Sequence, residues 1–283
     1  MKDKNSSLLV IGGPDSGKST YRAQLYYRVE HGDGELQLSK SMGNMAGLEA
    51  DINRLVRGLQ PMHTNLDSYS EATFSITDRQ GNVTALAFAD YGGEQIGQIG
   101  RTNVIKNDWI ERAKSSSAWL FFLRIDHLRP TKSFMTQPVE ATISANKEEE
   151  PLTQYESYQC DAIEVLQRLL FVRGNSRRYK LGAPKIGIFL SCWDEVGEAP
   201  ENQQIINVLQ KRAPLFKQFV TSNWETGRYQ FWGLSSTERK LPEANPDIEF
   251  ARKGPEKVGY LINESGDKID DLTVPIVWLM NDK

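Results

Sequence analysis

Cysteine, histidine and long hydrophobic runs are scarce in this chain of 283 residues. Its two cysteines, Cys160 and Cys192, form no C-x-x-C pair, so the sequence indicates neither a disulfide framework nor a zinc site. No apolar run approaches the roughly 20 residues that a membrane-spanning helix needs, and the first residues contain no signal-peptide core. We therefore expect a cytoplasmic protein that does not enter a membrane.

An excess of one charge is also missing. The formal net charge is −3, with 34 basic and 37 acidic residues. This balance gives no electrostatic reason to expect a nucleic acid or an anionic membrane as partner. Hydrophobic residues make up 39% of the chain, which is enough for a substantial core, and the length suits one large α/β domain over residues 1–283.

Apolar runs of strand length alternate along the chain with segments of helical period. We expect strands at 8–11, 73–77, 83–89, 119–123, 186–190 and 229–234, and helices beginning near 19 and covering 46–59, 104–114 and 155–172. A short polar turn joins the strands at 73–77 and 83–89, which predicts an antiparallel hairpin. Residues 127–154 lack a sustained apolar period and are interpreted as a mobile insertion, and residues 237–257 as a surface insertion.

The most informative stretch follows the first apolar run and has the pattern G-x-x-x-x-G-K-S from Gly12 to Ser19. Gly12 and Gly17 allow backbone angles that turn successive N–H groups inward around a phosphate. Lys18 can reach the terminal phosphates, Ser19 can offer its hydroxyl to Mg²⁺, and the helix that begins there directs its positive end at the anion. The residues expected to bind the nucleotide here are Gly12, Gly13, Pro14, Asp15, Ser16, Gly17, Lys18, Ser19 and Thr20.

A second loop, Asp90-Tyr91-Gly92-Gly93, follows the strand at 83–89. A carboxylate at the end of a buried strand is costly unless something pairs with it, and facing a phosphate loop it can hold Mg²⁺ directly or through water. Gly93 allows its backbone N–H to approach a γ-phosphate, so this loop can sense whether that phosphate is present.

Two further polar loops follow later strands. Ser191-Cys192-Trp193-Asp194 comes after the strand at 186–190, and Ser235-Ser236 after the strand at 229–234. Ligands in open α/β sheets bind beyond the carboxyl ends of parallel strands, so both loops are candidates for a nucleotide site.

Taken in order, these loops resemble those of the Ras-like P-loop GTPases of the translation-factor and signalling class. The phosphate loop and Asp90-Tyr91-Gly92-Gly93 match that pattern directly, whereas Ser191-Cys192-Trp193-Asp194 keeps only the aspartate of the usual Asn/Thr-Lys-x-Asp motif. The whole pattern, with its insertions, looks like the bacterial double-GTPases associated with conflict and defence systems. The resemblance implies a three-layer α/β P-loop NTPase fold with Ras-like topology and insertions, whose mostly parallel sheet has one antiparallel edge strand.

The resemblance also implies roles for individual residues. GTP or GDP would be bound with Mg²⁺ as cofactor, Asp194 would accept both N–H groups of guanine, and Thr64 would be the switch threonine. Trp193 could cover the base, although packing against the sheet is the commoner fate of such a tryptophan. The expected metal ligands are Ser19, Thr64 and Asp90; the hydrolytic group is Lys18, Thr64, Gly93, Glu94 and Gln95; and the base contacts are Ser191, Trp193, Asp194, Ser235 and Ser236.

Hydrolysis is expected to be slow, because Glu94 stands where many Ras-like proteins have glutamine and Gln95 comes one position later. An arginine from this chain, such as Arg101, or from a partner would then be needed. Asp15 occupies the place of an asparagine that helps some related GTPases bind a monovalent cation, which suggests stimulation by K⁺.

Three readings of the function stay open. The first is a GTP-binding switch that signals to a protein effector or activator through the loops of Thr64 and Gly93. The second is a P-loop ATPase or kinase in which Arg173, Arg177 and Arg178 form a phosphate lid, although a solvated basic loop is the simpler reading. The third is a nucleotide-binding interaction module with incidental turnover that docks through residues 127–154. A homodimer formed across the nucleotide is compatible with each reading.

Overall fold

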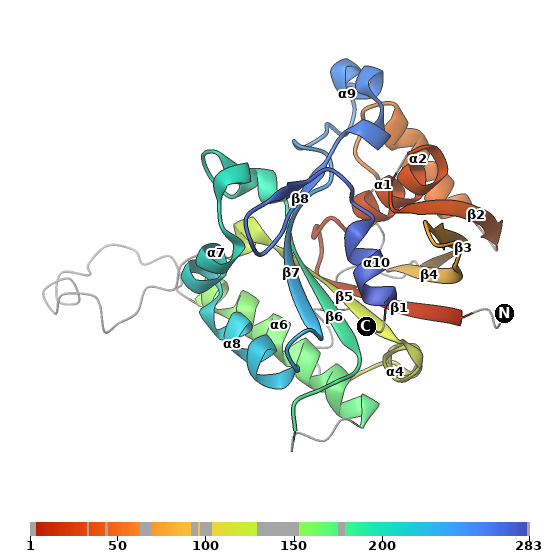
Figure 1. Cartoon of the computed structure of the whole chain (residues 1–283). Helices are drawn as coiled ribbons and strands as arrows, with labels where there is room; N and C mark the ends of the chain where they lie inside the picture. The colour runs from red at the N-terminus through yellow and green to blue at the C-terminus, as the bar shows by residue number, and fades with distance from the viewer. Residues whose placement is uncertain are drawn as a thin grey trace, which may run out of the picture.

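The computed structural model describes residues 4–32, 34–42, 45–62, 69–91, 96, 104–128, 153–174 and 179–281, which form a nine-stranded sheet and the helices around it (Figure 1). The strands are β1 Lys4–Gly12, β2 Leu36–Met42, β3 Tyr69–Asp78, β4 Val83–Tyr91, β5 Ala118–Arg124, β6 Lys185–Ser191, β7 Tyr229–Ser235, β8 Tyr260–Ile262 and β9 Lys268–Ile269. Their order across the sheet is β2-β3-β4-β1-β5-β6-β7-β8-β9.

The centre of the sheet is parallel and its two margins are antiparallel. Strands β4, β1, β5, β6 and β7 run in one direction, so their carboxyl ends meet at one edge. On one side β3 pairs antiparallel with both β4 and β2, and on the other β8 pairs antiparallel with both β7 and β9. The predicted hairpin of β3 and β4 and the mostly parallel sheet are confirmed, whereas β2, β8 and β9 were not predicted.

Helices cover both faces of the sheet, which gives three layers (Figure 1). One face packs against α4, α6, α7 and α8 and the other against α1, α2, α9 and α10. The α-helices are α1 Lys18–His31, α2 Ala46–Val56, α4 Asn107–Ser115, α6 Thr153–Arg173, α7 Ile205–Arg212, α8 Pro214–Asn223, α9 Ile248–Lys253 and α10 Val274–Met280, and the short 3-10 helices are η1 Ile125–His127, η3 Trp193–Glu195, η4 Pro200–Asn202 and η5 Pro255–Lys257.

The central strands read as unbroken apolar runs because both of their faces are buried. In β1, Leu9 and Ile11 join the core on the side of α6, whereas Leu8 and Val10 join the core on the side of α1. Alternate side chains of a strand point to opposite faces, so a strand covered on both sides has no solvent-facing position. This explains why the strand signals in the sequence were strong.

Helix α1 is held by polar contacts as well as apolar ones. The Gln24 side-chain amide donates to the carbonyls of Pro255 and Val258, each over 2.6 Å, and the Tyr21 hydroxyl donates to the carbonyl of Leu272 over 2.9 Å. Buried polar groups in proteins are normally satisfied in this way. The C-terminal part of the chain therefore fixes the helix that follows the phosphate loop.

Residues 237–257 differ from the predicted surface insertion. Leu241 and Phe250 are buried, at 3% and 1% exposure, and both belong to the core on the side of α1. The segment reads as polar in sequence because its few apolar side chains are spaced irregularly. It is part of the folded body, and its first residues reach the candidate site described below.

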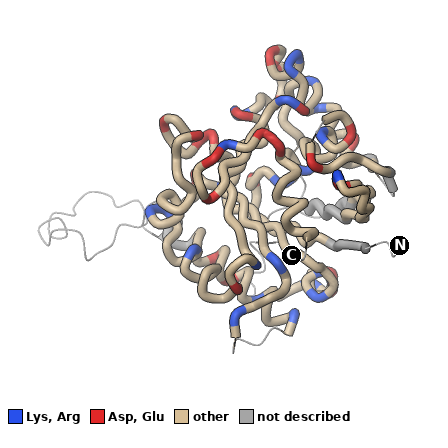
Figure 2. The backbone as a smooth tube through the Cα atoms, viewed as in Figure 1, with Lys and Arg blue, Asp and Glu red and all other residues tan. Residues whose placement is uncertain are grey.

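Figure 2 shows basic and acidic residues interspersed along the backbone of the described residues. In the part of the chain that the structure describes, no helix combines the length and the apolar character needed to cross a bilayer. Residues 129–152, which include most of the predicted mobile insertion, lie outside the described residues.

Candidate functional site

The phosphate loop, residues 12–19, joins the carboxyl end of β1 to the first turn of α1. A Cβ at Gly12 would lie 2.7 Å from Ser16 Oγ and 2.9 Å from Phe122 Cβ, so only glycine fits at the start of the loop. Gly17 has a φ of +82°, in the left-handed region that glycine adopts without strain, and it precedes the first residue of α1. The sequence therefore forms the expected sharp turn before a helix N-terminus.

Two side chains of this loop fold back onto its own backbone. Ser16 Oγ donates to the carbonyl of Gly13 over 2.8 Å, and Lys18 Nζ donates to the same carbonyl over 2.7 Å. Lys18 is 6% exposed, and its ammonium also lies 3.3 Å from Ser16 Oγ. The phosphate loop therefore surrounds the Lys18 ammonium, next to the positive end of the α1 dipole. This arrangement binds an anionic phosphate.

A cavity of about 800 Å³ opens beside this loop. Its lining includes residues 14–20 and, from the ends of later strands, Ser191, Asp194 and Ser236. The structure thus places around one cavity residues that were predicted to contact a nucleotide and that lie more than two hundred positions apart in the chain. The volume falls in the range of small-molecule sites, about 300–1,000 Å³.

The carboxylate of Asp194 is held in place by a neighbouring strand. Ser235 Oγ at the end of β7 donates to Asp194 Oδ1 over 2.6 Å, and Ser235 itself has no exposed surface. Ser235 does not line the cavity, whereas Ser236 does. Ser235, predicted as a base contact, therefore lies outside the cavity, and its hydroxyl instead orients the Asp194 carboxylate, which lines the cavity.

Trp193 does not cover the cavity. Its side chain has no exposed surface, and its indole N–H donates to the carbonyl of Pro200 over 2.7 Å. A Cβ at Gly233 would lie 2.4 Å from the indole ring, so the ring packs directly on the backbone of β7. The prediction that Trp193 covers a base is wrong, and the alternative, packing against the sheet, is correct. Gly233 has no side chain, so the indole ring packs flat against the backbone of β7.

Ser191 and Cys192, from the first half of the base loop (residues 191–194), also line the cavity. Ser191 Oγ is buried and has no hydrogen-bond partner among the described residues, and Ser191 Cβ faces Gly17 of the phosphate loop. Burial raises the pKa of the Cys192 thiol to about 12. Cys192 is therefore a neutral thiol at physiological pH and brings no charge to the base loop.

The structure adds an ion-pair network that was not predicted. Arg124, the last residue of β5, donates from Nε to Asp126 Oδ1 over 2.6 Å, from Nη1 to the carbonyl of Asp15 over 2.7 Å and from Nη2 to Glu195 Oε2 over 3.2 Å. Burial raises the pKa of Asp126, but the hydrogen bond and positive charge of Arg124 outweigh it, so the net pKa lies below the usual value. Arg124 follows the apolar strand at 119–123, so the strand-end rule that identified Asp194 would also have identified it.

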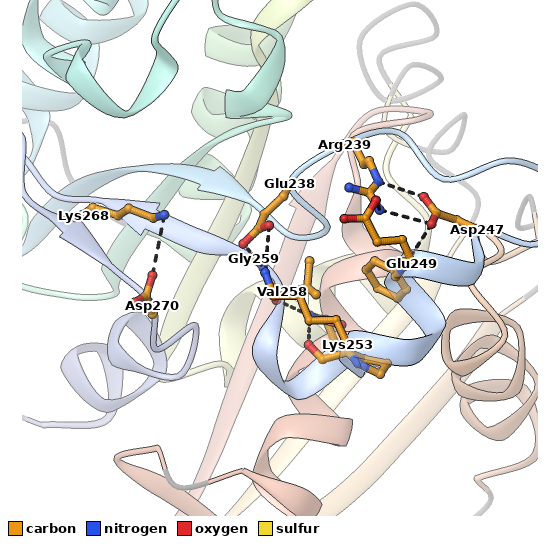
Figure 3. Close-up of polar contacts among 12 residues, drawn as sticks. Glu238, Arg239, Asp247, Glu249, Lys253, Val258, Gly259, Lys268 and Asp270 are labelled. Carbon is orange, nitrogen blue, oxygen red and sulfur yellow. Dashed lines mark hydrogen bonds and ion pairs between the residues drawn. The ribbon is translucent and has the colours of Figure 1, made fainter.

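One wall of the cavity comes from the segment after β7. Thr237, Arg239 and Leu241 line the cavity there. The Arg239 guanidinium pairs with both oxygens of Asp247, over 2.8 and 3.1 Å, and reaches Glu249 over 3.1 Å (Figure 3). These contacts attach the wall to the start of α9.

The same wall is joined to the segment that leads toward Thr64. The backbone N–H of Gln60 donates to the carbonyl of Pro242 over 3.0 Å. The Arg54 guanidinium donates to the carbonyls of Gln60 and Glu243, each over 2.7 Å. Gln60 and Arg54 also line the cavity, so the residues just before the predicted switch threonine are part of the site.

Several predicted residues lie outside the described ones. They are Thr64, Gly93, Glu94, Gln95, Arg101, Arg177 and Arg178. The backbone of Asp90 lies near the carboxyl end of β4, two residues beyond Phe88, which pairs with Leu8 of β1. Arg173 donates to the carbonyls of Ala113 and Ser116 at the end of α4, so its guanidinium joins two helices and does not act as a phosphate lid.

Comparison with known proteins adds independent information. The family model described as Double-GTPase 1 matches residues 9–279. Among solved structures, the Arl6 BBS3 small GTPase from Trypanosoma brucei with bound GppNp matches 81% of this chain and 86% of its own, at 12% identity and a TM-score of 0.37. A bacterial selenocysteine-specific elongation factor, EF-Sec, matches 81% of this chain at 15% identity and a TM-score of 0.35, and the match spans only 25% of that factor. No curated protein matches the chain.

Proposed function

Since the chain belongs to the Double-GTPase 1 family, and is therefore a GTP-binding protein with GTPase activity, we propose that it works as a nucleotide-dependent switch for a protein partner. In this proposal GTP is hydrolysed slowly with Mg²⁺ in the cytoplasm, and an unidentified effector or activator responds to the bound nucleotide. The resemblance to bacterial double-GTPases is what suggests a conflict or defence setting.

The observation that carries the proposal is the position of Asp194 relative to the phosphate loop. Lys18 and Asp194 line one cavity, and Ser235 orients the carboxylate of Asp194. A carboxylate can accept the two adjacent N–H groups of guanine, whereas adenine offers no such pair. We therefore assign the phosphates to residues 12–20 and the base to Asp194 and Ser236.

The residues around the loop fit a magnesium ion bound together with the phosphates. Ser19 lines the cavity in the first turn of α1, and Asp90 is the last residue but one of β4, the strand next to β1. Hydroxyl and carboxylate oxygens are the ligands that Mg²⁺ prefers. We assign Ser19 and Asp90 to the metal, with Thr64 joining them when the switch closes; the ion would neutralise charge on the phosphates.

Slow turnover is part of the proposal because the glutamine expected beside the γ-phosphate is displaced. Glu94 follows Gly93, and Gln95 comes one position later. A carboxylate repels the phosphate charge and orients water less well than an amide does there. An arginine in the transition state would supply the missing charge, either Arg101 or one from the activating partner.

The contacts of the cavity wall support the proposal that binding of the base is coupled to the switch segment that contains Thr64. The Arg54 guanidinium donates to the carbonyls of both Gln60 and Glu243. A nucleotide that contacts this wall would therefore also influence the conformation of the segment that continues to Thr64. A partner that recognises the closed form of this segment would distinguish GTP from GDP. Equal binding of the partner to the empty, GDP and GTP forms would instead support an interaction module.

Potassium stimulation through Asp15 is a further expectation. Asp15 has a φ of +51° and lines the cavity, so the tip of the loop is held in an unusual conformation beside the phosphates. We expect turnover to be faster in K⁺ than in Na⁺ at the same ionic strength, and measurement of released phosphate in the two salts checks it. Equal rates would remove a role for a monovalent cation.

The experiment that tests the function is direct binding of GTP and ATP with Mg²⁺. The wild-type chain should prefer GTP, and Asp194→Ala should lower its GTP affinity by about 10–100-fold because a charge-assisted hydrogen bond to the base is lost. ATP affinity should not change. The matched control is Glu198→Ala, an exposed carboxylate that follows the base loop and does not line the cavity.

Two results would contradict this assignment. A preference of the wild-type chain for ATP would favour the P-loop ATPase or kinase reading. An unchanged ratio of GTP to ATP affinity in Asp194→Ala would mean that residues 191–194 form only a strand-end loop.

A further inference from the structure

Arg124 is the point at which three loops of the site meet. It ends β5, which lies between β1 and β6 in the sheet, and its Cα pairs with that of Ser191 at the start of the base loop. Its side chain is 17% exposed and uses all three guanidinium nitrogens in hydrogen bonds. These bonds reach the phosphate loop at Asp15, the segment after β5 at Asp126, and Glu195, the residue that directly follows the base loop.

The geometry of a guanidinium suits this position. Its planar group presents donors in fixed directions, so it can bond a carbonyl and two carboxylates at once, which a lysine ammonium on a flexible stem does less well. Asp126 holds Nε, and this contact fixes the orientation of the two terminal nitrogens. Nη1 and Nη2 then connect the Asp15 carbonyl to the Glu195 carboxylate.

The base loop has no cation of its own to make this connection. Its second residue is Cys192, whose thiol is neutral, and the rest of the loop is serine, a buried tryptophan and Asp194. Arg124 therefore brings a positive charge from the neighbouring strand to the boundary between the base loop and the phosphate loop. Glu195, its partner, directly follows Asp194 in η3.

We propose that Arg124 is a positioning residue that couples recognition of the guanine base to binding of the phosphates, by fixing the base loop to the phosphate loop through Asp15 and Glu195. This inference rests on the proposed function, because it needs a nucleotide that spans both loops. A nucleotide bound to rigidly connected loops gains both sets of contacts without the entropy cost of ordering one loop against the other. The coupling should therefore show in affinity for whole nucleotides and not in affinity for a phosphate chain alone.

The test compares Arg124→Ala and Arg124→Lys with the wild-type chain, using GTP, ATP and tripolyphosphate, each with Mg²⁺. Loss of charge-assisted hydrogen bonds should weaken GTP binding by about 10–100-fold in Arg124→Ala. The ratio of GTP to ATP affinity should fall, while tripolyphosphate affinity should change by less than about threefold. Arg124→Lys should resemble Arg124→Ala, because a lysine cannot make the three-way contact.

Two outcomes would overturn the inference. One is an unchanged ratio of GTP to ATP affinity in Arg124→Ala. The other is an equal loss for GTP and tripolyphosphate, which would confine Arg124 to supporting the phosphate loop. Arg252→Ala, an exposed arginine of α9, is the matched control for loss of one positive charge.

The experiment separates this inference from the proposed function. If the wild-type chain fails to bind GTP, the proposed function is wrong and the inference fails with it. If the wild-type chain prefers GTP and Arg124→Ala keeps the same ratio of GTP to ATP affinity, only the inference fails. Should Arg124→Ala not fold, Glu195→Ala decides the matter, because it removes only the link to the base loop. It should lower the GTP to ATP ratio and leave tripolyphosphate affinity unchanged, and an unchanged ratio would overturn the coupling.

Discussion

Replacing Lys18 with alanine should lower the kcat/KM for GTP hydrolysis by about 10²–10³-fold, the usual loss when one preorganised charge-stabilising donor is removed. Lys18 is buried in the curve of the phosphate loop, with its ammonium 2.7 Å from the carbonyl of Gly13. In the proposed function this ammonium contacts the β- and γ-phosphates, as the lysine of a phosphate loop does, and neutralises charge on the transferring group. Steady-state phosphate release, together with titration of a fluorescent GTP analogue, would measure the loss in kcat and in affinity.

The fold should survive this substitution, which makes the result interpretable. Ser16 Oγ still donates to the carbonyl of Gly13 over 2.8 Å, so one of the two contacts that close the loop remains. Lys211→Ala, which removes an exposed lysine of α7, loses the same charge and should hydrolyse GTP like the wild type. Activity of Lys18→Ala within about threefold of the wild type would show that residues 12–19 are not the site of phosphate transfer.

The sequence predicted the elements whose signals are local. The run at 8–11, the glycines that follow it and the strands at 119–123 and 186–190 are each readable within a few residues, because strands buried on both faces carry only apolar side chains. β2 was not predicted because its pairing with β3 specifies it. A shift of register between Leu38 and Lys40 also breaks the alternation of apolar and polar side chains that marks a strand. β8 and β9, of three and two residues, are too short to give a periodic signal.

Some of the residues that line the cavity were named from the sequence, but the contacts that connect them were not. The order of the loops identified Asp194 and Lys18, yet the contact of Ser235 with Asp194 joins residues 41 positions apart. The pairing of Arg124 with Glu195 joins residues 71 positions apart. Such contacts depend on which strands are neighbours in the sheet, and no spacing along the chain specifies them. Trp193 shows the same limit, because its burial depends on a glycine in β7.

Replacing Arg22 with methionine should lower the free energy of unfolding by about 3–5 kcal/mol, the usual cost of leaving one member of a buried ion pair without its partner. Arg22 lies in α1, and its Nη2 donates to Asp51 Oδ2 of α2 over 2.9 Å. The two side chains are only 2% and 12% exposed, so solvent cannot replace the lost partner of Asp51. Chemical denaturation followed by tryptophan fluorescence would measure the difference.

A double substitution separates the cost of breaking the buried ion pair from the loss of packing. Arg22→Met with Asp51→Leu removes both charges and should recover most of the stability lost in the single variant, because no buried ion remains. Arg57→Met, an exposed arginine at the end of α2, should change stability by less than about 0.5 kcal/mol. A double variant as unstable as Arg22→Met would mean that Arg22 matters for its packing or its other contacts. The pair joins α1, which carries the phosphate loop, to α2, which leads to Gln60, so Arg22→Met should also weaken nucleotide binding where the double variant does not.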